Sequence, residues 1–95
     1  MDYDTAQNVA GVLKALGHPV RLQIVELLEH GEMCVGDVVE KLGIPQSAAS
    51  QQLGLMKDKQ VLQWRREGAK VFYSIKNPNV IKLLHCVHSH SGKKN

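Results

Sequence analysis

The sequence predicts a mainly α-helical domain that carries one β-hairpin near its carboxyl end. Three observations support this fold class. Apolar residues recur every three or four positions through most of residues 5–59, as in helices with one buried face. The period changes to two around a glycine within residues 61–75, as expected for two strands joined by a turn. Helical spacing returns over residues 80–90, so the expected order is four helices, two strands and a last helix.

Length and composition favour a single domain over residues 1–95. No apolar run approaches the roughly 20 residues that cross a bilayer, so we expect no membrane contact. The first residues, MDYDTAQ, are acidic and lack the apolar segment of a signal peptide, which predicts a cytoplasmic location. Two cysteines are too few for a disulfide framework, and in a reducing compartment we expect thiols or metal ligands.

The first two predicted helices cover residues 5–16 and 19–30. The first has one apolar stripe, formed by Val9, Val12, Leu13 and Leu16. Gly17-His18-Pro19 separates the two helices, because proline suits the first position of a helix but cannot continue one. The second helix is apolar around much of its circumference, through Leu22, Ile24, Val25, Leu27 and Leu28. This breadth predicts that it is the central core helix.

Residues 35–59 are expected to form a helix-turn-helix, around which the rest of the chain is organised. The first helix has apolar residues at i, i+3, i+4 and i+7, namely Val35, Val38, Val39 and Leu42. Gly43 follows where helices commonly end, since glycine takes positive φ at little cost, and Ile44-Pro45 turns the chain. The second helix turns three apolar residues inward, Ala49, Leu53 and Met56. Two short helices joined by about three residues are typical of this motif.

The second helix of the motif leaves a polar face exposed near its start, formed by Gln46, Ser47, Ser50 and Gln51. Amide and hydroxyl groups form hydrogen bonds with base edges in the major groove of double-stranded DNA. Any helical hairpin has a solvated face, however, so this pattern alone leaves an ordinary structural hairpin as an alternative.

The predicted hairpin over residues 61–75 carries a basic tip. Alternating residues on either side of Glu67-Gly68 indicate two strands, and Arg65, Arg66 and Lys70 lie near the turn. Guanidinium and ammonium groups in this position are suited to DNA phosphates. We expect Trp64 to pack against the core rather than stack on a base, because it occupies an alternating apolar position.

The charge of the chain changes sign at the predicted helix-turn-helix. Residues 1–42 hold three basic and seven acidic side chains, whereas residues 43–95 hold nine basic and two acidic ones. A basic half that begins at such a motif indicates nucleic-acid binding, and ordinary surface lysines are the alternative interpretation.

The last predicted helix, over residues 80–90, has more apolar surface than one chain is expected to cover. Ile81, Leu84, His85 and His88 share one of its faces, beside Leu83 and Val87. Because the hairpin separates this helix from the others in sequence, we expect its apolar face to close a dimer.

Three segments of the chain resemble the ArsR/SmtB family of winged helix-turn-helix repressors: LKALGHPVRLQIVELL, EMCVGDVVEKLGIPQSAASQQLGLM and RREGAKVFYSI. The resemblance implies a homodimer held by helices at about 5–16 and 80–90, with recognition helices that meet successive major grooves of an operator. It implies that the hairpin over residues 61–75 is a wing. Gln46, Ser47, Ser50 and Gln51 match the recognition helix, and Arg65, Arg66 and Lys70 match the wing.

The same resemblance implies release from DNA by an inducer, and Cys34 is the first candidate to sense it. EMCVGDV is similar to the metal-binding segment ELCVCDL of arsenic and cadmium sensors, although Gly36 replaces the second cysteine. Cys34 occupies an expected N-cap, with Asp37 at the spacing of a capping box. A helix start favours negative charge, so a thiolate there is suited to a soft metal or a reactive inducer.

The expected inducer is a metal ion or metalloid, with Cys34, His85, His88 and His90 as candidate ligands for zinc or a softer metal. His85 and His88 are spaced to share a helix face, and the alternative interpretation is that the two side chains extend the dimer surface. The alternative inducer is sulfide or an oxidant, sensed by Cys34 together with Cys86. A bridge between them requires Cα atoms within about 7 Å.

The two alternatives outside transcriptional repression are an enzyme and a protein-interaction module. An enzyme is not expected, because the chain has no Gly-rich phosphate loop, no HExxH segment and no nucleophile elbow. A winged-helix module that binds only proteins is the second alternative. Such a module has no use for a basic hairpin beside a polar recognition helix.

Overall fold

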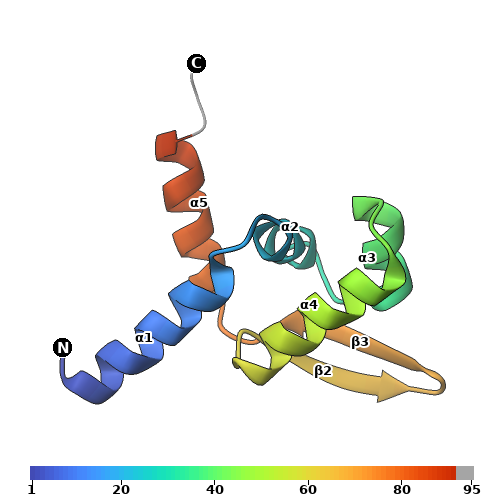
Figure 1. Ribbon diagram of the computed structural model, residues 1–95, viewed down its shortest axis with the longest axis horizontal. Coiled ribbons are helices and arrows are strands. Elements are labelled where there is room, and N and C mark those ends of the chain that lie inside the picture. The colour runs from blue at the N-terminus through green and yellow to red at the C-terminus, as the bar shows by residue number, and fades with distance from the viewer. Residues whose placement is uncertain (92–95) are drawn as a thin grey trace.

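The computed structural model of the protein describes the backbone of residues 1–91 and the side chains of residues 1–89. Over this range the chain forms five helices and three strands (Figure 1). The elements are α1 Tyr3–Leu16, α2 Pro19–Leu28, β1 Met33–Cys34, α3 Val35–Leu42, α4 Gln46–Asp58, β2 Leu62–Glu67, β3 Lys70–Ile75 and α5 Asn79–Ser91. The predicted fold class, mainly helical with one β-hairpin wing, is therefore confirmed.

Helix α2 is the centre of the fold, as its apolar breadth predicted. Ile24 and Val25 are completely buried and Leu28 nearly so. In Figure 1, α1 and α5 lie to the left of α2 and α3 lies to its right. The helix contacts α1, α3, α4, α5 and β3. It ends at Leu28, two residues before the predicted boundary, and Gly31 has a positive φ of 140° in the loop that follows.

The helix-turn-helix is closed by side chains from both of its helices. Val38 of α3 and Leu53 of α4 are completely buried, as are Ala49 and Met56. Gly43 ends α3 with φ 66° and ψ 34°, the left-handed conformation that glycine adopts without steric cost. The turn that follows lets α4 begin at Gln46, one residue after the proline that was expected to turn the chain.

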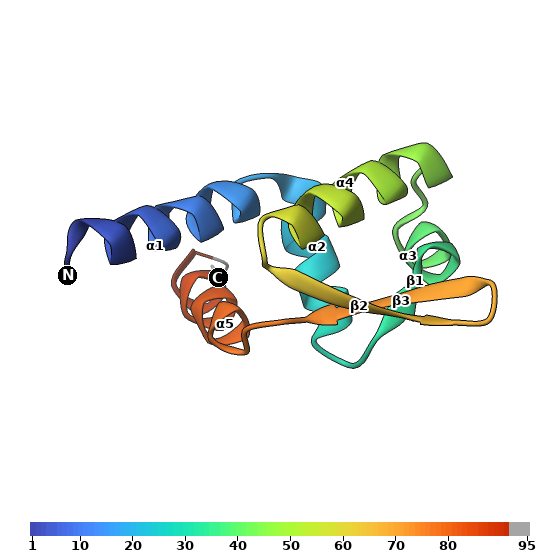
Figure 2. The same ribbon diagram turned by 90° about the horizontal axis from the view of Figure 1, so that it is seen from below.

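The sheet contains one strand more than predicted. Strands β2 and β3 form the predicted hairpin around Gly68, and β1 adds to β3 on the other side, in the order β1-β3-β2 with all pairs antiparallel. Strand β1 has only two residues, Met33 and Cys34, so no alternating pattern can reveal it. Figure 2 shows the hairpin beneath α4, with its tip at the end of the molecule opposite the N-terminus.

Trp64, expected to be a packing residue, is less buried than its alternating apolar position suggested, because half of its surface is exposed. Only the first residue of β2, Leu62, is buried, and the rest of the strand extends beyond the core. Lys57 of α4 places its Nζ 5.7 Å from the centre of the Trp64 ring. The indole therefore lies between the hairpin and the last turn of α4.

None of the helices in residues 1–91 combines the length and the apolar character needed to cross a bilayer.

Candidate nucleic-acid interface

The polar face predicted for the second helix of the motif is the outer surface of α4. Gln46, Ser47, Ser50 and Gln51 are all exposed, whereas the opposite face of the helix is buried. Pro45 is the N-cap residue and its side chain makes no cap hydrogen bond. The amides of the first turn are therefore not satisfied by a capping side chain, and such groups attract anions such as phosphate.

Helix α4 is held in place by a link that the sequence did not reveal. The Nε of Arg21 donates to Oε1 of Gln52 at 2.8 Å, and Arg21 Nη1 donates to the carbonyl of Ala15 at 3.2 Å. One half-buried side chain of α2 thus connects the end of α1 to the middle of α4. Helical spacing placed Gln51 but not Gln52 on the outward face, and it gave no sign that Gln52 contacts Arg21.

The tip of the hairpin carries two exposed basic residues, Arg66 and Lys70. Glu67 and Lys70 are cross-strand partners at the end of the ladder, and Arg66 is opposite Val71. In Figures 1 and 2 the hairpin tip and the start of α4 lie at the same end of the molecule. The polar face of α4 and the basic tip are therefore presented from neighbouring elements.

Arg65 is also exposed, but carboxylates already occupy its guanidinium group. Its Nε and Nη2 donate to the two carboxylate oxygens of Glu32 at 2.9 and 2.6 Å, and Nη1 donates to Glu67 at 2.7 Å. Hydrogen bonds from Arg65 hold the pKa of Glu32 below its usual range, and those carboxylates raise the pKa of Arg65. The sequence gave no signal for Glu32, because 33 residues separate it from Arg65.

Cys34 occupies the N-cap of α3 as predicted, and Asp37 supplies the return half of a capping box. The carboxylate of Asp37 accepts from the backbone N–H of Cys34 and from its thiol, both at 3.3 Å. The thiol is half-buried. A thiolate at this position would face the negative charge of Asp37, which works against the favourable helix start.

The structure does not bring Cys34 and Cys86 together in one chain. Cys34 ends β1, whereas Cys86 is an exposed residue of α5. In Figure 2, β1 and α5 lie on opposite sides of α2. Neither cysteine forms a disulfide in the described structure. In the sequence, the two thiols loosely match the placement of a sensing pair, but in the structure α2 lies between β1 and α5.

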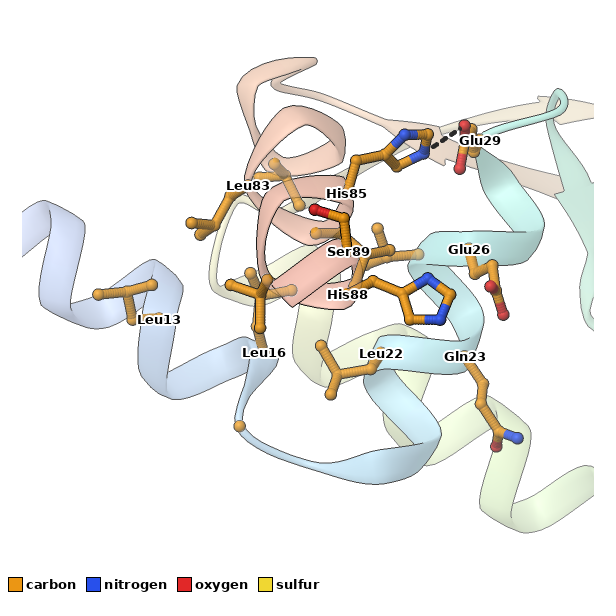
Figure 3. Close-up of a pocket in the computed structure, with 15 residues that line it drawn as sticks. Leu13, Leu16, Leu22, Gln23, Glu26, Glu29, Leu83, His85, His88 and Ser89 are labelled. Carbon is orange, nitrogen blue, oxygen red and sulfur yellow. Dashed lines mark hydrogen bonds and ion pairs between the residues drawn. The ribbon is translucent and has the colours of Figure 1, made fainter. Parts of the chain in front are cut away.

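His85 and His88 of α5 face α2 rather than Cys34. His85 Nε2 lies 2.7 Å from the Oε2 of Glu29 at the end of α2, and Figure 3 shows His88 extending from α5 toward α2. The side chain of His90 lies outside the described residues. Among the side chains that the structure describes, no three His, Cys, Asp or Glu residues are placed to hold a metal ion. Within the described residues of one chain, Cys34 is therefore not brought together with His85 and His88, because α2 separates Cys34 from α5.

An apolar hollow of about 700 Å³ lies between α1, α2 and α5 (Figure 3). Large apolar side chains on these helices remain accessible, with exposed fractions of 49% for Leu13, 38% for Leu22, 37% for Leu83 and 55% for Val87. Such a surface commonly marks a contact with another molecule. It includes both helices that were expected to form a dimer.

Comparison with known proteins identifies the family. A family profile described as "Bacterial regulatory protein, arsR family" matches residues 18–59, which hold α2 and the whole helix-turn-helix. The transcriptional repressor PagR of Bacillus anthracis is 42% identical over 88 residues, which cover 88% of this chain and 88% of PagR. The chain belongs to the ArsR family. Its members are DNA-binding transcriptional regulators and not enzymes, so this chain is such a regulator.

Solved structures of ArsR proteins share the fold. The repressor BigR of Xylella fastidiosa has a TM-score of 0.86 at 33% identity, covering 96% of this chain and 93% of that one. A homodimeric winged helix-turn-helix DNA-binding domain from Mycobacterium bovis, described as a possible ArsR-family regulator, has a TM-score of 0.81 at 33% identity. It covers 96% of this chain and 86% of that one. The resemblance to this family predicted from three segments is thus confirmed.

Proposed function

We propose that the protein is a homodimeric repressor that blocks a promoter by binding an operator in double-stranded DNA. In this proposal, the outer face of α4 enters the major groove, and Gln46, Ser47, Ser50 and Gln51 contact base edges and phosphates. Arg66 and Lys70 of the hairpin contact the neighbouring backbone. One observation carries the proposal: α4 exposes all four polar side chains while burying Ala49, Leu53 and Met56 on its other face.

The homodimer is proposed to form through α1 and α5. Their exposed leucines and valines need a partner, and a symmetric contact between identical faces supplies one without a second protein. A two-fold axis through this contact would give two copies of α4, related by symmetry, as half-sites of DNA about one helical turn apart require. The homodimeric relative from Mycobacterium bovis supports a homodimer, and the repressors PagR and BigR support a role in repression.

Binding to DNA is tested with the full chain and a library of random-sequence duplexes, followed by titration of a selected duplex at several salt concentrations. If a dimer neutralises about six to eight phosphates, log K falls with log salt at a slope of about −5 to −7. Selection of a sequence with two-fold symmetry would support the dimer. A flat salt response would reject DNA binding and favour the protein-interaction module.

Release from DNA is proposed to start when a thiophilic inducer binds the sulfur of Cys34. A metal ion would replace the proton on Sγ, whereas a polysulfide would transfer one sulfur atom to Sγ as its own S–S bond breaks and the shortened polysulfide leaves with the proton. Either change removes the hydrogen bond from the thiol to Asp37 at the start of α3, the first helix of the DNA-binding motif. A metal or metalloid remains one candidate, although the described residues do not form a complete site. A sulfide-derived or oxidising inducer is the other, and it needs no ligand set.

The inducer class is tested on the preformed protein–DNA complex. Zinc, cadmium and arsenite form one series of additions to the reduced protein, and polysulfide and peroxide form the other, with reactive thiols counted before and after. If zinc, cadmium or arsenite releases the DNA, and the thiol count returns to its starting value once the metal is chelated, the inducer is a metal or metalloid. Release with persistent loss of thiols assigns a thiol-reactive one. If neither series releases DNA, Cys34 is not a sensor.

A further inference from the structure

The contacts of Arg65 differ from those of the other basic residues on the hairpin. Three of its five N–H groups are engaged by two carboxylates, and the contact to Glu32 uses both oxygens of the carboxylate. Its guanidinium carbon also lies 4.9 Å from the centre of the Phe72 ring, so the group rests on an aromatic face. Arg65 is therefore fixed in direction before any DNA is present.

The charge around Arg65 is unsuited to phosphate. One guanidinium and two carboxylates leave this cluster with a net charge of −1, so it repels a DNA backbone unless another cation approaches. Arg66 and Lys70 have no ion pair to a carboxylate among the described residues. Of the three basic residues near the hairpin tip, Arg65 is therefore paired with carboxylates, whereas Arg66 and Lys70 remain available for phosphate.

Glu32 connects this cluster to a different part of the fold. It lies in the segment between α2 and β1, two residues before Cys34, whereas Arg65 and Glu67 belong to β2. Strand β1, which follows Glu32, and strand β2 are not neighbours, because β3 lies between them. The side chain of Arg65 reaches across the sheet, over Phe72 of β3, to tie the outer strand of the hairpin to the chain that leads into α3.

We infer that Arg65 is a positioning residue for DNA binding: through Glu32 it fixes the wing relative to the helix-turn-helix, and it makes no phosphate contact of its own. This inference rests on the proposed DNA-binding function and changes the role predicted for Arg65 from the family resemblance. A two-oxygen contact fixes the direction of a guanidinium better than a single one does. The angle between the wing and α4 follows from that contact.

The test compares Glu32→Gln, Arg65→Gln, the double variant Glu32→Gln/Arg65→Gln, and Arg66→Gln as the matched control. DNA affinity is measured across salt for each. We expect Glu32→Gln and Arg65→Gln each to weaken binding by about 2- to 5-fold, the size of an exposed ion pair, with the salt slope unchanged. The double variant should be no weaker than either single variant, because both remove the same contact. Arg66→Gln should reduce the steepness of the slope by about 1.

Whether Glu32→Gln weakens or tightens DNA binding distinguishes a positioning role of Arg65 from a phosphate contact. Removing a negative charge beside DNA tightens binding by itself, and it would also free Arg65 for phosphate. Tighter binding by Glu32→Gln, or a loss of about 1 in slope for Arg65→Gln, would overturn the positioning role. Arg65→Lys adds a second criterion. Lysine retains a phosphate-binding charge but not the two-oxygen contact, so this variant should be as weak as Arg65→Gln.

A readout without DNA distinguishes failure of this inference from failure of the proposed function. Trp64, the single tryptophan of the chain, is half-exposed next to Arg65 and near Lys57 of α4. Its quenching by acrylamide, a neutral quencher that does not respond to the charge changes themselves, should change equally in Glu32→Gln and Arg65→Gln, and remain as in the wild type in Arg66→Gln. Unchanged quenching in the first two variants would contradict the inference. Absence of DNA binding with this quenching pattern intact would reject only the proposed function.

Discussion

Cys34 and Arg65 both pair with Phe72, one from each side of strand β3. Directly opposite residues in antiparallel strands place their side chains on the same face of the sheet, so the three form one row. Arg65 reaches over the Phe72 ring to Glu32, which precedes Cys34 by two residues. A change at the Cys34 sulfur therefore occurs one strand away from the contact that holds the wing.

The first prediction concerns the sensing role proposed for Cys34. Cys34→Ser should leave DNA binding within about 2-fold of wild type, because serine is a good N-cap residue and its hydroxyl also donates to Asp37. It should abolish release of DNA by the inducer found with the wild-type protein. Anisotropy of a labelled operator before and after addition of the inducer measures both properties.

Cys86→Ser is the matched control for this prediction. Its element lies on the other side of α2 from β1, so release should persist in this variant if Cys34 acts alone. Release that is lost in both variants would instead support a pair of thiols, formed between the two protomers. Persistence of release in Cys34→Ser would exclude Cys34 as the sensor.

The second prediction separates base contacts from phosphate contacts. Gln51→Ala removes an exposed amide from α4 and should alter the preferred base at one position of each half-site, with a discrimination of about 1–3 kcal/mol. Lys70→Ala should weaken binding to all duplexes alike and reduce the salt slope by about 1. Repeated selection with each variant measures the preference. Equal effects on all sequences in both variants would contradict the assignment of α4 to the groove.

The third prediction is a response of the wing to acid. Hydrogen bonds from Arg65 lower the pKa of Glu32, so the folded protein holds this carboxylate charged more strongly than the unfolded chain does. The contact is fully present above the ordinary pKa of glutamate and is lost as the pH falls through the lowered value. Trp64 emission should therefore show an acid transition below the usual glutamate range, and Glu32→Gln should lack it.

A similar shift elsewhere in the chain makes the choice of probe important. Hydrogen bonds from the side chain and the backbone of Thr5 lower the pKa of Asp2 at the start of α1, and the backbone N–H of Thr5 donates to Asp2 Oδ1 at 2.8 Å. Its protonation loosens that helix in a similar acid range, so global unfolding would mix the two effects. Trp64 lies in the hairpin and isolates the wing. An unchanged transition in Glu32→Gln would assign the signal to another group.

The elements with regular apolar spacing were predicted well from the sequence. The predicted start of α2 at Pro19 and the predicted span of α3 were correct, because their signals are local: a proline, a glycine and a repeat of three to four residues. The outward face of α4 was also predicted, since its buried and polar residues alternate with the helical period. Patterns of this kind are complete within one segment.

The features that sequence could not provide depend on contacts between distant segments. Arg65 has the guanidinium group that is expected of a phosphate contact, and only the ion pair with Glu32 shows that this group is already engaged. Trp64 follows the alternation of a buried residue, but its strand extends past the core that would cover it. Cys34 and Cys86 matched a pair only in order along the chain, and α2 lies between their elements.

The fourth prediction tests the packing that presents α4. Leu53 is completely buried between α4 and the rest of the core, so Leu53→Ala should lower the free energy of unfolding by about 2–5 kcal/mol. Denaturant unfolding at one fixed protein concentration measures the change, because a dimer's stability depends on concentration. Gln51→Ala, on the exposed face of the same helix, should change it by less than about 0.5 kcal/mol.

The last prediction concerns the dimer surface. Val87 is 55% exposed on α5 and lines the apolar hollow, so Val87→Glu places a charge where the partner's apolar face is proposed to lie. The variant should remain folded, because Val87 is not part of the buried core, but should sediment as a monomer and lose most DNA affinity at the same concentration. Val87→Leu should retain both. A monomeric wild type, or a dimeric Val87→Glu variant with normal DNA binding, would place the dimer contact elsewhere.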